Sequence, residues 1–194
     1  MTAPKRYAIE PPPDFLSREA ALFVAQLDDL NRRLIEDTRD LTAEALAWQP
    51  GPGQNTMGML LAHVAYWEAF WTRFVLEDRP SPVEVRDVLG LDRADVGTPL
   101  PADGRPPAGL AGREIAFFHD LLARARAHTY EVARRFGDAE LEREIVRQRP
   151  DGSQNVFTPR WALYHMLEHE AGHYGQVLLL RHLQRRASER APGA

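Results

Sequence analysis

The amino-acid sequence predicts an all-α fold, a four-helix bundle with a long crossover between the second and third helices. Four segments carry apolar side chains at intervals of three and four residues, the spacing of one face of a helix. No long run alternates polar and apolar side chains as a half-buried strand would. The connection at residues 79–109 is long enough to cross the length of a bundle. A chain of 194 residues suits one domain, which we expect over residues 1–194.

The first helix is expected over about residues 15–39. Its apolar stripe consists of Phe23, Leu27, Leu30 and Leu34. Three prolines at 11–13 precede it, and proline does not fit a helix interior. This run therefore predicts an extended lead-in to the helix.

The second helix is expected over about residues 56–77, after the turn-rich stretch PGPGQN. Asn55 or Thr56 would cap its first turn, because the short polar side chains of both can accept a hydrogen bond from the free backbone N–H groups there. The stripe predicted to face inward consists of Leu60, His63, Trp67, Trp71 and Phe74.

The third helix is expected over about residues 113–136, where Gly137 would end it. One face of this helix carries Phe118, Leu122, Ala125, Val132 and Phe136. The crossover before it is dense in Pro and Gly and offers only a short helix, at about 83–89.

The fourth helix is expected over about residues 159–186. Thr158 can cap it, and Pro159 suits the first helical position because its missing N–H would be unpaired there anyway. Between the third and fourth helices, a turn signal at 150–153 lies between the apolar pairs at 145–146 and 156–157. This pattern predicts a small hairpin.

Composition excludes several classes of function. The sequence contains no cysteine, which excludes disulfides, thiolate metal ligands and a cysteine nucleophile within these residues. The net charge of −4 gives no basic field for nucleic acid. No apolar run reaches the length of a signal peptide or a membrane span, so we expect a cytoplasmic protein without a membrane or nucleic-acid partner.

The fourth helix carries His165, His169 and His173 at intervals of four residues, and the last two belong to the pattern H-E-x-x-H. Successive members rotate by about 40° around the axis and share one face. Two imidazoles spaced in this way can bind one metal ion. His63, on the inward stripe of the second helix, is the candidate third ligand, and three nitrogens would leave positions open for water or substrate.

The same histidines are open to two other interpretations. A buried histidine is often a core residue hydrogen-bonded to backbone, which would make the spacing accidental. A zinc protease of the long H-E-x-x-H type would need Gly at 176 and His at 179, where this chain has Gln176 and Leu179. Glu170 is also rotated about 100° from His169, so it need not reach the open side of the metal.

Two blocks of the sequence resemble the DinB/YfiT-like superfamily of metal-dependent enzymes. Residues 40–71, DLTAEALAWQPGPGQNTMGMLLAHVAYWEAFW, are similar to its entry loop and the helix with an early histidine. Residues 158–183, TPRWALYHMLEHEAGHYGQVLLLRHL, are similar to its terminal helix, with H-x3-H followed by a Gly-Gln pair. The resemblance implies a divalent ion, nickel or zinc, on His63, His169 and His173, and a homodimer.

The residues around this centre are expected to shape a pocket. His165 lies one turn before the ligand pair, and the resemblance makes it a pocket residue and not a ligand. Tyr66 and Trp67 lie about one turn beyond His63, and Gln176 follows His173 by three residues. Each of these three also has a plain structural interpretation, as a core aromatic or a buried hydrogen-bond partner.

The resemblance leaves three functions open. Some relatives resemble transferases that use a low-molecular-weight thiol, such as bacillithiol or mycothiol, and others have been proposed as hydrolases. We expect a metal-dependent transferase that activates such a thiol for a small-molecule substrate. The alternatives are a metal-dependent hydrolase and a non-catalytic metal-binding module of a stress response.

Overall fold

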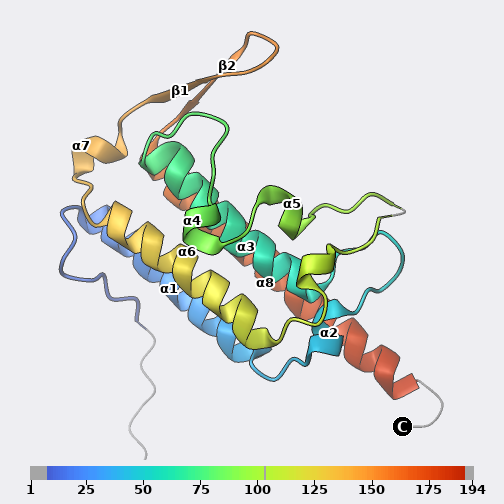
Figure 1. Ribbon diagram of the computed structural model, residues 1–194. Coiled ribbons are helices and arrows are strands. Elements are labelled where there is room, and N and C mark those ends of the chain that lie inside the picture. Colours follow the sequence, from blue (N-terminus) through green and yellow to red (C-terminus); the bar gives the residue numbers. More distant parts are fainter. Residues whose placement is uncertain (1–7, 103, 191–194) are drawn as a thin grey trace, which may run out of the picture.

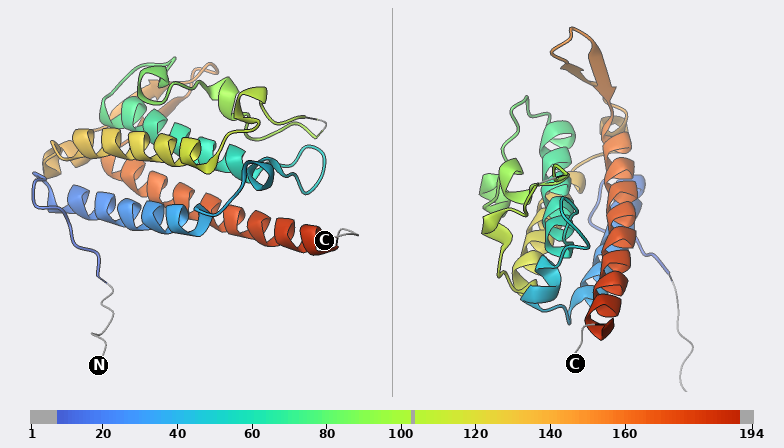
Figure 2. Two further views of the ribbon diagram at one scale, coloured as in Figure 1. Left: turned by 60° about the horizontal axis from the view of Figure 1, so that its bottom comes forward. Right: turned by 90° about the vertical axis from the view of Figure 1, so that its right-hand side faces the viewer.

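The computed structural model describes residues 8–102 and 104–190. The single domain expected over residues 1–194 extends beyond these ranges, and its remaining residues lie outside the described part of the chain. The long helices are α1 (Arg18–Thr38), α3 (Met57–Trp71), α6 (Ile115–Ala133) and α8 (Pro159–Arg190). They run side by side, with α1 and α3 each packed against α6 and α8 (Figure 1; Figure 2). The described part of the chain is therefore mostly helical, as predicted.

Helix α1 begins three residues later than expected. The Ser17 hydroxyl accepts a hydrogen bond from the Ala20 N–H at 3.2 Å and caps the first turn. Of the predicted stripe, Leu27, Leu30 and Leu34 are buried, and Phe23 packs at the edge of the core. After α1 the chain makes the short helix α2 (Ala43–Ala47).

Helix α3 is enclosed on nearly every side. Thr56, and not Asn55, caps it, because its hydroxyl accepts from the Met59 N–H at 3.1 Å. Every residue from 57 to 66 is buried, so α3 lacks the single inward stripe predicted for it. Trp67 and Trp71, the two members of that stripe that are only partly buried, lie nearer the surface. Beyond Trp71 the helix continues as a π-helical segment, η1 (Thr72–Leu76).

The prediction that Gly137 ends the third helix is wrong. Helix α6 ends at Ala133, and the N–H groups of Arg135 and Phe136 bond to the carbonyls of Val132 and Ala133 in a tightened turn. Gly137 instead caps the next helix, α7 (Asp138–Leu141), and donates its N–H to Glu140 at 3.0 Å.

The crossover between η1 and α6 is part of the core. It contains α4 (Arg86–Leu89), α5 (Arg93–Val96) and the 3-10 turn η2 (Ala108–Leu110). Each piece buries an apolar side chain against the core beside α3: Leu89, Val96 and Leu110. The expected helix at 83–89 corresponds to α4, and the other two pieces were not predicted.

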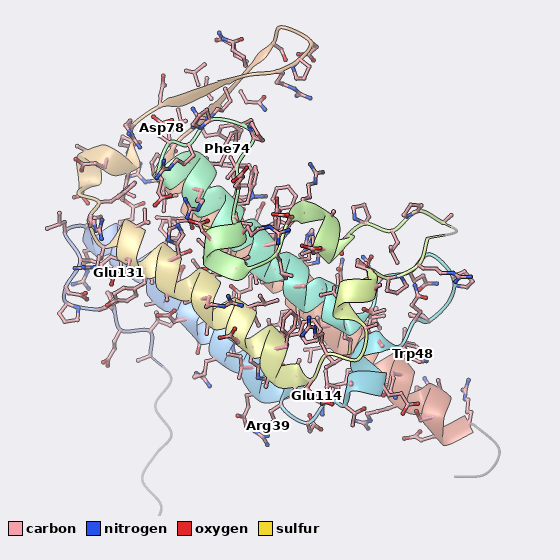
Figure 3. The ribbon with its side chains drawn as sticks, viewed as in Figure 1. Arg39, Trp48, Phe74, Asp78, Glu114 and Glu131 are labelled. Carbon is pink, nitrogen blue, oxygen red and sulfur yellow. The ribbon has the colours of Figure 1, made fainter. Side chains whose placement is uncertain are left out.

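The predicted hairpin is present as β1 (Ile145–Gln148) and β2 (Gln154–Phe157), which pair antiparallel with Ile145 opposite Phe157. Arg147 donates to the Phe74 carbonyl and to Asp78 Oδ1, both at 2.7 Å, and so ties the hairpin to the end of η1 (Figure 3 labels Phe74 and Asp78). Helix α8 then begins as predicted, because Thr158 accepts the N–H of Trp161 at 3.2 Å.

Within the described ranges, no helix combines the length and the apolar character needed to span a membrane.

Candidate metal centre

Helices α3 and α8 lie antiparallel and in contact, and the candidate centre lies between them (Figure 1). The inward position of His63 follows from the burial of α3, where its side chain is only 7% exposed. His169 and His173 stand one turn apart on α8 and face the same side. The structure thus brings together the three histidines that the sequence singled out.

The ring nitrogens of the three histidines converge. His169 Nε2 lies 3.2 Å from His63 Nε2 and 3.1 Å from His173 Nε2, and one ligand atom from each residue falls within 4.8 Å of the others. Metal–nitrogen bonds of about 2.1 Å place neighbouring ligand nitrogens about 3.0–3.4 Å apart. The cluster therefore fits a divalent ion without a large rearrangement.

Burial keeps the imidazoles of His63 and His169 neutral. It lowers the pKa of His63 to about 3, with smaller contributions from His173 and His169. It also lowers the pKa of His169 to about 4, helped by His173 and His165. Neutral imidazole is the form that binds a metal, so neither side chain would have to lose a positive charge before coordinating near neutral pH.

Gln176 orients His173. The distance from His173 Nδ1 to Gln176 Oε1 is 2.8 Å, and because Oε1 can only accept, Nδ1 carries the proton. The free lone pair of the His173 ring is then on Nε2, which points into the cluster. This is the outer hydrogen bond that metal-binding histidines usually make.

Trp67 has the opposite effect on His63. The indole N–H donates to His63 Nδ1 at 3.1 Å, which places the proton of the neutral ring on Nε2, inside the cluster. Coordination through Nε2 requires that this proton leave, with Nδ1 protonated instead. The indole N–H of Trp67 would then lose its acceptor.

His165 lies beside the cluster and not in it. Its ring stacks on Trp161 at 4.7 Å, meets Trp71 edge-on at 5.0 Å, and lies 6.0 Å from the His169 ring. Its Nδ1 is 3.0 Å from the Glu168 carboxylate. Tyr66 is buried against Trp67 and Phe70, without a contact to the histidines among the interactions found in the described residues.

A buried ion cluster that was not predicted from the sequence lies next to His169. Arg126 of α6 donates to Glu68 of α3 at 2.8 and 3.0 Å and to Glu170 of α8 at 2.8 Å. Asp28 of α1 lies 3.3 Å from the same guanidinium. One feature of the sequence could have indicated this cluster. Charged residues occur on helix faces whose other side chains are apolar and therefore expected to be buried.

Glu170, the acidic residue of H-E-x-x-H, belongs to this ion cluster. Its carboxylate points to Arg126 and lies outside the group of convergent ligand atoms. Burial raises the pKa of Glu170 to about 7, against the attraction of Arg126. This placement does not support the general base of a zinc protease.

Fold and site together define a mostly helical protein, with one small two-stranded sheet, whose three-histidine cluster could hold a metal ion. The family model of the DinB superfamily matches residues 26–177, more than half of the chain and all three histidines. The chain belongs to the DinB superfamily.

A crystal structure described as a conserved protein from Enterococcus faecalis has a similar fold, with a TM-score of 0.61 and 18% sequence identity. The alignment covers 84% of this chain and 94% of that chain. At this identity the likeness shows the fold alone. Among curated proteins, no match was found.

Proposed function

We propose that this protein is a metal-dependent transferase that activates a low-molecular-weight thiol at His63, His169 and His173. The convergence of three ring nitrogens, with nitrogen–nitrogen distances of 3.1 and 3.2 Å, carries the proposal. Three nitrogen ligands suit nickel or zinc and leave positions open for a substrate.

A divalent ion at this site would lower the pKa of a thiol and favour the thiolate near neutral pH. The chain contributes the orientation of the site. Gln176 directs the lone pair of His173 inward, and burial keeps His63 and His169 neutral. Because the sequence has no cysteine, the sulfur has to come from a cosubstrate.

We propose that α1, α3, α6 and α8 form the four-helix bundle of the superfamily, and that the protein acts as a homodimer in the cytoplasm. Sedimentation equilibrium of the purified chain would measure the oligomeric state, and a monomer would refute the homodimer.

The first test is the metal content of purified protein by elemental mass spectrometry, for the wild type and for His63→Ala. We expect about one zinc or nickel ion per chain in the wild type and loss of the ion in the variant. His182→Ala is the matched control, because His182 is an exposed histidine of α8 outside the cluster. Equal metal content in the wild type and His63→Ala would refute the site.

The second test follows the reaction. A thiol that displaces chloride from monochlorobimane gives a fluorescent adduct, and we expect the loaded wild type to accelerate this step with bacillithiol or mycothiol. Hydrolysis of an ester or amide substrate without added thiol would instead indicate a metal-dependent hydrolase. A loaded protein inactive in both assays would indicate a non-catalytic metal-binding module.

A further inference from the structure

A pocket of about 320 Å³ lies beside the histidine cluster, at the end where α3 begins. Its walls come from the loops at 53–55 and 99–100, from Leu60 of α3, and from Gln176, Leu179 and Leu180 of α8. A pocket of this size accommodates a small organic molecule.

The pocket is one helical turn from the ligands on both helices. Leu60 precedes His63 by three residues, and Gln176 follows His173 by three. Because α3 and α8 are antiparallel, both steps lead to the same end of the centre (Figure 1). Residues three apart on a helix are neighbours about 5–6 Å apart. A small molecule in the pocket would therefore lie about one helical turn from the cluster, and Gln176 both lines the pocket and hydrogen-bonds to His173.

The chemistry of the walls selects an uncharged ligand. Leucine and proline side chains provide the apolar contacts, and the polar side chains are the amides of Gln54, Asn55 and Gln176. No charged side chain of the described residues lines the pocket. The walls therefore offer a carboxylate or ammonium group no side chain of opposite charge among the described residues.

Two of the amide side chains that line the pocket have polar atoms without a hydrogen-bond partner in the described residues. Gln176 uses its oxygen on His173, and no hydrogen bond from its NH2 group to another described residue was found. Asn55 Oδ1 is buried and has no hydrogen-bond partner in the described part of the chain. The carbonyl oxygen of a secondary amide would accept from the NH2 group of Gln176, whose side chain is exposed on α8.

The rim of the pocket is already formed. Gly53 has a φ of +72°, and a Cβ at this position would lie 2.3 Å from the carbonyl oxygen of Ala102, so the two loops pack closely. Gln49 holds the same loop through the Gln54 carbonyl at 2.7 Å. Leu179, at the pocket, is 57% exposed, and a bound ligand would cover this apolar side chain.

We propose that this pocket binds the uncharged, amide-bearing part of a small aliphatic thiol whose sulfur reaches the histidine cluster. The sulfur end rests on the proposed function. Binding of the amide depends on the pocket alone. Two probes therefore test binding of the amide and binding of the sulfur separately. N-acetylcysteamine has the amide and the thiol, whereas N-ethylacetamide has the same skeleton without sulfur.

The experiment titrates each probe into zinc-loaded protein and follows the amide signals by NMR. We expect both probes to shift signals of residues 53–55 and of Gln176 and Leu179, and N-acetylcysteamine to bind more tightly. Leu179→Glu places an uncompensated charge at the pocket and should weaken both probes about tenfold. Leu178→Glu is the matched control, because Leu178 is also exposed on α8 but does not line the pocket.

The outcomes distinguish the two claims. Equal affinities in Leu179→Glu and Leu178→Glu, or shifts confined to other parts of the chain, would overturn the pocket. Equal affinity of both probes for the wild type, with the loss in Leu179→Glu retained, would keep the pocket for amides and refute the thiol at the metal. Zinc content measured in both variants confirms that the charge has not emptied the site.

Discussion

The indole N–H of Trp67 favours the His63 tautomer with the proton on Nε2, and this tautomer would oppose coordination of a metal ion through that atom. Because Phe cannot donate to Nδ1, Trp67→Phe frees the tautomer that coordinates through Nε2. One hydrogen bond contributes about 0.5–1.5 kcal/mol, so zinc affinity should rise by up to about tenfold. Competition with a chromogenic chelator measures this affinity.

Trp161→Phe is the control for this prediction, because Trp161 stacks on His165 and has no contact with His63 among the ring contacts found. Weaker zinc binding in Trp67→Phe than in the control would mean that Trp67 supports the site instead of opposing it. In the wild type, quenching or a shift of tryptophan fluorescence should accompany zinc binding, since loading removes the acceptor of Trp67.

Glu170 is expected to be dispensable for metal binding. Its carboxylate is bonded to Arg126 and is directed away from the convergent nitrogens. Glu170→Gln keeps an oxygen that can accept from Arg126, so its metal content should equal that of the wild type. A variant purified without metal would assign a ligand role to Glu170 after all.

At the scale of elements, Arg126 joins α6 to α3 and α8, the two helices that carry the histidines. Arg126→Met would leave Glu68 and Glu170 buried without a cation, since both carboxylates are nearly inaccessible to solvent. Breaking a buried ion pair in this way costs about 3–5 kcal/mol. Urea unfolding should show a loss of this size in the free energy of unfolding.

A triple variant provides the control for this cost. Adding Glu68→Gln and Glu170→Gln to Arg126→Met removes the stranded charges, and most of the lost stability should return. If Arg126→Met unfolds at the wild-type urea concentration, the cluster does not hold these helices together. If the triple variant is no more stable than Arg126→Met, packing and not charge accounts for the loss.

The helices could be predicted where local signals decide their ends. Thr56 and Thr158 cap α3 and α8 within the sequence neighbourhood that the pattern marks. The role of Gly137 was predicted wrongly, because glycine is found before the first residue of a helix as well as after the last. Whether Gly137 ends α6 or begins α7 depends on how α7 packs. The four-residue helices of the crossover have too few turns to show a period.

At the scale of the whole molecule, the site could be predicted only in part. His169 and His173 share a helix, so their spacing alone indicates that they act together. His63 lies 106 residues from His169 along the chain. Its role as the third ligand was predicted from its position on an apolar helix face and from the family resemblance. The Glu68–Arg126–Glu170 cluster joins three helices, and no local pattern reports such pairing.

The pH dependence of the free energy of unfolding reports on both the histidine cluster and the buried ion cluster around Arg126. With a chelator present, unfolded His63 and His169 gain protons near pH 6.5, whereas the folded side chains stay neutral until about pH 3 and about pH 4. Their contribution to stability is present above pH 6.5 and is lost as the pH falls through these folded values. Glu170 acts in the opposite direction, because its raised pKa makes a contribution that is present below about 4.5 and is lost as the pH rises through about 7.

Between about pH 4.5 and 6.5 the two histidines outweigh the single carboxyl, so the free energy of unfolding should fall as the solution is acidified. Glu170→Gln removes the opposing contribution and should make this fall steeper. His63→Ala removes a histidine contribution and should make it shallower. Urea unfolding at several pH values gives the slope of the free energy of unfolding against pH for the wild type and for each variant. Titratable groups that all three proteins share contribute equally to these slopes, so differences between the slopes report on the substituted residue. Identical slopes would mean that neither cluster keeps its shifted pKa values in solution, and the neutral imidazoles inferred for the metal centre would lose their support.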